Sequence, residues 1–227
     1  MSYTAEELDE LFNSNALERI GMGSRRSCYR LPCGKLCVKC YKSDLEILEG
    51  KDPGTPNSRP LAPVAAKEIR RFRFNERKNT CCQEYRYWKN LPKGIRKYFP
   101  ATIEMRNTAS RGWSLIEEFI LNEDGSPIVK FLPAWKNASD EEQRLLASLL
   151  NELEATLAYH SIRFFDPQTI MVQRTREGFR LRIPDFEPAT RTLIPIDALF
   201  PIFTRMKMRR RFARYRKKLG MKCTTTA

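Results

Sequence analysis

The stretch that decides the fold runs from Ile20 to Tyr41 and reads IGMGSRRSCYRLPCGKLCVKCY. Glycines and a proline interrupt short runs of β-forming residues in it, which is typical of antiparallel strands joined by tight turns. The pattern therefore predicts a short β-meander with a turn between Pro32 and Lys35. We expect the N-terminal part of the chain to be built on a sheet.

On either side of this meander the sequence predicts helices and a second pair of strands. Residues 6–13 are compatible with a short helix, and the helical pattern of residues 64–91 follows a proline-rich loop at residues 50–63. Two runs with strand character, residues 101–106 and 113–120, flank the turn sequence NTASRG. Helices and antiparallel strands in one chain indicate the α+β class.

The C-terminal part is expected to contain a long core helix. Ser139 and Glu142 have the spacing of a capping box, in which each side chain accepts a hydrogen bond from a backbone N–H at a helix start. The leucines that follow recur at three- and four-residue spacing and predict one buried face. They are Leu145, Leu146, Leu149, Leu153 and Leu157.

A loop and a tight hairpin are predicted after this helix. The loop, YHSIRFFDPQTIMVQ at residues 159–173, contains Asp166 directly before a proline, a pair that is common in turns. The runs TIMVQ and FRLRI flank the turn sequence TREG and predict the hairpin. A second carboxylate, Asp185, comes directly after it in the sequence PDFEP.

The composition indicates a folded chain with an anionic partner. Hydrophobic residues make up 41% and charged residues 30%, which is a globular composition, and no apolar run is long enough to cross a bilayer. The acidic N-terminus lacks the features of a secretion signal, so we expect a cytoplasmic protein. The formal net charge of +14 favours nucleic acid, anionic lipid or a phosphorylated ligand as the partner.

The cysteines and the histidine limit the chemistry. Four of the seven cysteines lie between Cys28 and Cys40, but the cluster lacks a second pair at the distance that a zinc site needs. Reduced thiols that fill β-strands are therefore the preferred interpretation. The single histidine, His160, excludes chemistry that requires two histidines and is expected to cap or pack the end of the core helix.

Several features follow one another in the order typical of nucleotide-dependent phosphoryl transfer. That reaction needs a glycine turn over the phosphates, a strand lysine, a helix glutamate that holds the lysine, and carboxylates for the metal and the acceptor hydroxyl. The sequences IGMGSRR, LCVK and CCQEYRYW supply the first three. Each feature alone is weak, and their order supports the interpretation. The candidates are Gly21 and Gly23, Lys39, Glu84, Asp166 and Asp185.

These stretches resemble the protein-kinase-like superfamily and, within it, the YrbL family, the PhoP regulatory network proteins of bacteria. The resemblance is carried by IGMGSRRSCYRLPCGKLCVK, QEYRYWKNL, PQTIMV and PDFEPATRTLIP, which lie within residues 16–219. It implies a minimal two-lobed protein-kinase-like fold, with a β-rich lobe over residues 1–118 and a helical lobe over residues 119–227. The second lobe would include a basic tail at residues 205–219.

The resemblance also implies ATP and Mg²⁺ as cofactors. Lys39 would hold the phosphates and Glu84 would orient Lys39, while Gly21 and Gly23 would let the backbone approach the phosphates. Arg26 stands where a kinase has its third glycine, and its guanidinium can itself contact a phosphate.

Two alignments of the catalytic loop remain open. Anchoring on PQTIMV puts Phe164 at the position of the catalytic aspartate and Thr169 at that of the metal-binding asparagine, which removes both groups. A loop two residues shorter makes Asp166 the base that accepts the hydroxyl proton, with Gln168 or Thr169 as a substitute metal ligand beside Asp185. We prefer the second alignment because Asp166 is the only carboxylate in the loop.

We therefore expect a phosphotransferase that uses ATP and Mg²⁺ on an unidentified acceptor. The alternative is a catalytically inactive, pseudokinase-like regulatory protein whose basic tail contacts an anionic partner.

That tail has its own pattern. Between Arg205 and Lys218 it contains nine basic residues and no acidic one. An apolar stripe at helical spacing predicts docking on the protein's own core as the preferred interpretation, with an anionic membrane surface, a phosphorylated ligand or, less favoured, nucleic acid as alternatives. The stripe consists of Met208, Phe212, Tyr215 and Leu219.

Overall fold

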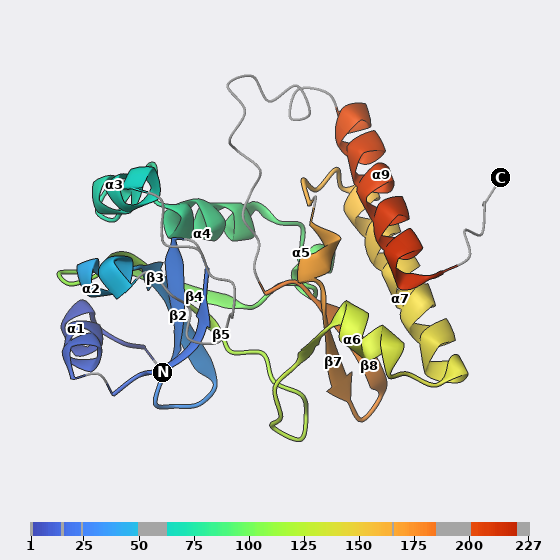
Figure 1. Cartoon of the computed structure of the whole chain (residues 1–227), viewed down its shortest axis with the longest axis horizontal. Coiled ribbons are helices and arrows are strands. Elements are labelled where there is room, and N and C mark those ends of the chain that lie inside the picture. Colours follow the sequence, from blue (N-terminus) through green and yellow to red (C-terminus); the bar gives the residue numbers. More distant parts are fainter. Residues whose placement is uncertain are drawn as a thin grey trace. The chain divides into compact units, whose positions relative to one another are not determined.

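A computed structural model of the chain confirms the predicted α+β class (Figure 1). It has an antiparallel sheet in the N-terminal part and helices in the C-terminal part. The structure describes residues 2–14, 16–23, 25–49, 63–164, 166–184 and 201–221. Its contacts divide the chain into two units, of which the first comprises Met1–Asn90 with Ala101–Phe119, and the second Leu91–Pro100 with Ile120–Ala227. The predicted lobe boundary at residue 118 differs from this division because residues 91–100 belong to the second unit.

The first unit is built on five antiparallel strands in the order β1-β2-β3-β5-β4. The predicted meander is confirmed, with its turn at residues 32–35, and so is the second strand pair. The helical region that starts near residue 64 forms two helices, while residues 50–62 of the predicted loop lie outside the described residues. The elements are α1 (Ala5–Asn13), β1 (Glu18–Met22), β2 (Arg26–Arg30), β3 (Leu36–Tyr41), α2 (Asp44–Glu49), α3 (Pro63–Phe72), α4 (Thr80–Asn90), β4 (Thr102–Thr108) and β5 (Gly112–Glu118).

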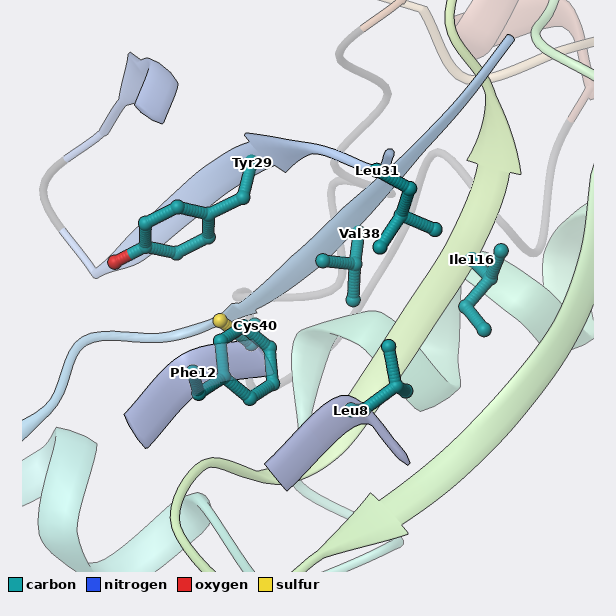
Figure 2. Close-up of a cluster of buried hydrophobic side chains, with 7 residues drawn as sticks. All are labelled: Leu8, Phe12, Tyr29, Leu31, Val38, Cys40 and Ile116. Atoms are coloured by element: carbon teal, nitrogen blue, oxygen red, sulfur yellow. The ribbon is translucent and has the colours of Figure 1, made fainter. Parts of the chain in front are cut away.

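One face of this sheet is covered by α1. The helix starts with a capping box, in which Thr4 and Glu7 each accept a backbone N–H from the other. Because side chains alternate between the faces of a strand, Val38 and Cys40 of β3 point to the α1 side and Lys39 between them to the other. Figure 2 shows the resulting apolar cluster, which consists of Leu8, Phe12, Tyr29, Leu31, Val38, Cys40 and Ile116.

The second unit combines helices with a three-stranded antiparallel sheet in the order β6-β7-β8. The predicted hairpin after the loop is confirmed as β7 and β8. The elements are α5 (Lys93–Arg96), β6 (Val129–Lys130), α6 (Phe131–Lys136), α7 (Asp140–Tyr159), the 3₁₀ turn η1 (Pro167–Thr169), β7 (Met171–Thr175), β8 (Gly178–Arg182) and α9 (Pro201–Leu219). Among the described helices, none is long and apolar enough to cross a membrane.

The core helix α7 begins with the predicted capping box between Ser139 and Glu142. Its predicted buried face is partly wrong. Leu145 is 44% exposed, whereas Leu150, which was not predicted, is fully buried. The buried stripe follows residues 146, 150, 153 and 157, and Leu145 lies about 100° of helix rotation away from it.

The basic tail forms α9, which lies beside α7 (Figure 1). Its predicted apolar stripe is buried within the second unit, so docking on the protein's own core is confirmed for this face. Phe212 contacts Phe164 edge to face at 6.2 Å between ring centroids, and Arg216 pairs with Glu154 of α7. At the helix end, the indole of Trp135 donates a hydrogen bond to the Leu219 carbonyl at 2.9 Å.

Residues 91–100 are tied to the rest of the second unit by specific hydrogen bonds. The hydroxyl of Tyr98 donates to Glu152 of α7 at 2.9 Å, and the Tyr98 carbonyl accepts from the N–H of Ile183 at 2.6 Å. The Phe99 carbonyl accepts from Arg182 at 3.3 Å.

Candidate functional site

Lys39 lies between two buried carboxylates on the face of the sheet opposite α1. Its ammonium nitrogen, Nζ, is 3.0 Å from Glu84 Oε1 and 2.8 Å from Glu117 Oε1. All three residues are less than a tenth exposed. The structure thus brings together the two residues that the sequence pattern paired, and it adds Glu117.

The position of Glu84 follows from how α4 begins. The amide oxygen of Asn79 accepts the backbone N–H groups of Cys81 and Cys82 at 2.8 and 3.3 Å, which caps the helix. Cys81 then packs with its sulfur 3.5 Å from the Lys39 carbonyl, and Glu84, three residues later, lies on the same helix face. The cap therefore sets the rotation that presents Glu84 to the sheet.

Arg26 of β2 binds the second oxygen of Glu84. Its guanidinium nitrogen Nη1 is 2.5 Å from Glu84 Oε2, so each oxygen of this carboxylate contacts one cation. With Glu117, these residues form a quartet of Arg26, Lys39, Glu84 and Glu117, which we call the charge quartet. Two cations face two carboxylates, so the quartet is neutral when both carboxylates are ionised.

Glu117 is the site residue that the sequence interpretation missed. Its place depends on strand register, because β3 and β5 pair Lys39 with Leu115 and Cys37 with Glu117. The signal available in the sequence was a pair of carboxylates, Glu117 and Glu118, at the end of an apolar strand. Burial, only partly offset by Lys39, raises the pKa of Glu117 to about 7.

The raised pKa of Glu117 predicts a pH dependence of stability. Between its ordinary pKa of 4.5 and about 7, the folded protein binds a proton that the unfolded chain has lost. Its contribution to the free energy of unfolding therefore falls as the pH rises through this window, by an amount on the order of 3 kcal/mol. Urea titrations across the window should show this decline in the wild type and not in Glu117→Gln. An equal decline in both proteins would contradict the assignment.

Gly21 lies in β1, where it pairs with Cys28 of β2, and Gly23 lies in the turn that follows, beside Arg26. The N–H of Gly23 donates to the Arg26 carbonyl at 2.8 Å. An added Cβ would lie 3.8 Å from the Cys28 Cβ at Gly21 and 3.7 Å from the Arg26 carbonyl at Gly23, which are ordinary contacts. Neither glycine has a positive φ. Local packing thus gives no reason for glycine at either position.

Asp166 has a structural role at the start of η1 in the second unit. Its side chain is exposed and accepts the N–H of Gln168 at 3.2 Å, while its carbonyl accepts the Thr169 hydroxyl at 2.8 Å. The amide oxygen of Gln168 in turn accepts from the ammonium of Lys218 at 2.8 Å. Phe164, by contrast, is buried.

The remaining candidates are placed as follows. Asp185, the predicted metal ligand, lies outside the described residues.

Cys37 and Cys40 are buried in β3, as expected of thiols that fill a strand, and Cys28 and Cys33 are half-buried. Within the described ranges, no group of three or more His, Cys, Asp or Glu residues is arranged to hold a metal ion. His160 caps the C-terminus of α7 and contacts the ring of Tyr159.

Comparison with known proteins does not identify a family for this chain. No protein-family model and no curated protein sequence matches the chain. Among solved structures, it is similar to the crystal structure of Cex1p at 10% identity and a TM-score of 0.39, over 91% of this chain and 31% of that one. The chain thus spans less than a third of that protein's length, and a similarity this low carries no argument about function.

Proposed function

We propose that the chain is a kinase-like protein of the YrbL type that binds a nucleoside triphosphate, with Lys39 and Arg26 as the contacts to its phosphates. The observation that carries the proposal is the buried ion pair between Lys39 and Glu84. A strand lysine held by a helix glutamate is the arrangement that kinases use to position phosphates.

Energetics support a functional reason for the charge quartet. Taking charges out of water costs about as much as their attraction returns, so a buried ion pair stabilises a fold little compared with apolar residues of the same size. A group of four charged side chains of which Lys39, Glu84 and Glu117 are buried is therefore poorly explained by stability. Ligand binding is the better explanation.

Glu117 can adapt the quartet to an anion. When Glu117 is protonated, the quartet has two cations and one carboxylate, a net charge of +1. A phosphate that contacts Lys39 adds negative charge nearby and raises the pKa of Glu117 further, since like charges disfavour ionisation. Near neutral pH, nucleotide binding should therefore be accompanied by proton uptake.

The fit to Mg²⁺ and to a transfer reaction is weaker. A bound Mg²⁺ would neutralise phosphate charge. The amide oxygen of Gln168 already accepts from the ammonium of Lys218, which disfavours it as a metal ligand, whereas the Thr169 hydroxyl donates its proton to a carbonyl and keeps its oxygen lone pairs. The metal assignment therefore depends on Asp185 and Thr169. The Asp166 carboxylate accepts one backbone N–H and retains acceptor capacity for the proton of a substrate hydroxyl.

A regulatory protein that does not transfer phosphate is the second candidate. It is favoured by the local bonds of Asp166, Gln168 and Thr169, which are those of a structural turn. The two candidates share the nucleotide site and differ in whether Asp166 supports turnover.

Calorimetry with ATP, with and without Mg²⁺, tests the binding site. We expect saturable binding by the wild type, and binding weaker by about tenfold or more in Lys39→Met. Lys35→Met is the matched control, because Lys35 is exposed in the turn before β3 and should bind like the wild type. Near-ultraviolet circular dichroism verifies that each variant is folded. Absence of saturable binding by the folded wild type would refute the nucleotide site.

Asp166→Asn separates the two candidates. If the protein transfers phosphate, this variant should retain nucleotide binding and lose hydrolysis or transfer of the γ-phosphate. If ATP binds and no turnover is detected in either protein, the regulatory function is favoured.

A further inference from the structure

We propose that the outward face of α9 docks on an anionic membrane surface. The inward face of this helix is already used, because its buried residues pack within the second unit. Packing against the second unit therefore does not explain the composition of the outward face, which needs an explanation of its own. The proposal does not depend on nucleotide binding.

The outward face is strongly cationic. Eight of its nine Lys and Arg side chains are exposed, and no acidic residue occurs between Arg205 and Lys218. Arg216 is the exception, since it turns inward to Glu154 and Asn151 of α7. The exposed cations are Arg205, Lys207, Arg209, Arg210, Arg211, Arg214, Lys217 and Lys218.

The same face is apolar at its N-terminal end. Ile202 is 64% exposed, Phe203 47% and Met206 45%. Residues three and four apart in a helix are neighbours on one side, so these three side chains share a side, and the same side continues to Arg210 and Lys217. The outward surface of α9 therefore presents a short apolar end followed by cations.

This combination favours a bilayer over nucleic acid. A polyanionic backbone attracts Lys and Arg but offers no apolar phase for Ile202, Phe203 and Met206. An anionic bilayer takes up both parts, because apolar side chains enter the boundary of headgroups and acyl chains while cations contact the anionic lipids. The helix is 19 residues long, which gives it a length of about 28 Å along such a surface.

Sedimentation of the full-length chain with vesicles tests the proposal. We expect binding to phosphatidylcholine vesicles that contain phosphatidylserine, weaker binding by roughly tenfold or more to pure phosphatidylcholine, and loss of binding at high salt. Equal binding to both vesicle types, or no binding to the anionic ones, would overturn it.

Charge reversal on the outward side should act locally. Arg210→Glu with Lys217→Glu should weaken binding to the anionic vesicles by roughly tenfold or more. Lys136→Glu with Arg144→Glu makes the same charge change at exposed positions of α6 and α7 and should leave most of the binding. If the two double variants lose binding equally, net charge rather than α9 explains it and the proposal fails.

The apolar end distinguishes membrane from nucleic acid. Ile202→Ser with Met206→Ser should weaken vesicle binding and leave unchanged whatever weak, salt-sensitive binding of duplex DNA the wild type shows. If this variant binds vesicles like the wild type, and the wild type prefers DNA, the face is a nucleic-acid surface and the membrane proposal is refuted. Thermal unfolding of each variant verifies that the second unit remains intact.

Discussion

Glu46→Gln is expected to lower the free energy of unfolding at neutral pH by about 3–5 kcal/mol, because it removes one partner of a buried charge pair. The Glu46 carboxylate is 7% exposed and pairs with the Arg111 guanidinium. It also accepts the hydroxyl groups of Ser27 at 2.5 Å and Tyr29 at 2.6 Å. A neutral amide in this place leaves the largely buried side chain of Arg111 beside the rings of Phe12 and Tyr29 without its counter-charge.

The effect should depend on pH in a defined direction. Burial alone would raise the pKa of Glu46, but hydrogen bonds from Ser27, Tyr29 and Ser43 and the charge of Arg111 lower it to about 2. A lowered carboxyl pKa stabilises the fold above the ordinary value of 4.5 and loses that contribution as the pH falls through about 2. The wild type should therefore lose stability in this acid window, and Glu46→Gln should lose less.

Chemical denaturation of both proteins measures this difference. The matched control is Glu76→Gln, which breaks the exposed ion pair with Arg86 and should cost less than about 1 kcal/mol. Equal losses in the two variants would show that the Glu46 network does not stabilise the first unit.

Gly112→Ala is expected to cost on the order of 3 kcal/mol or more, because both conformation and space exclude a side chain there. Gly112 has a φ of +66°, and an added Cβ would lie 2.4 Å from the Arg73 carbonyl oxygen. That carbonyl cannot easily move, since it accepts from the Asn79 amide at 2.9 Å and from the Trp113 N–H at 3.2 Å.

Gly125→Ala is the control that isolates the steric part. Gly125 has a φ of +81° but nothing within 4 Å of an added Cβ, so only the conformational cost of about 1 kcal/mol remains. Urea unfolding of the two variants should show a clearly larger loss at Gly112. Similar losses would mean that the Arg73 segment yields to the methyl group.

Local patterns were predicted well from the sequence. The capping box of Ser139 and Glu142 predicts the start of α7. The apolar stripe from Met208 to Leu219 predicts the buried face of α9. Each pattern depends only on residues within a few turns of one helix. Leu145 was misassigned for a related reason. In a run of leucines several stripes fit equally well, and tertiary packing decides which is buried.

Long-range features could not be predicted in this way. Glu117 reaches Lys39 through the register of β3 against β5, and Glu46 meets Arg111 across 65 residues of sequence. Neither pairing leaves a periodic or motif signal. Asp166 is the opposite example, because its local sequence is sufficient to predict its structure. An aspartate before a proline predicts the observed turn, and a catalytic role would be additional to this structural one.

Residues 91–100 belong to the second unit although they lie between two segments of the first, and this limits how the chain can recombine in evolution. The chain passes from one unit to the other three times, at residues 90–91, 100–101 and 119–120. A single break at residue 119 would carry Tyr98 away from Glu152 and Ile183 and leave its neighbour Phe99, also buried, in the wrong half. Neither unit is one continuous segment of the chain, so a single recombination event could not transfer either of them intact. We therefore expect the two units to be inherited together, with insertions tolerated around them rather than between them.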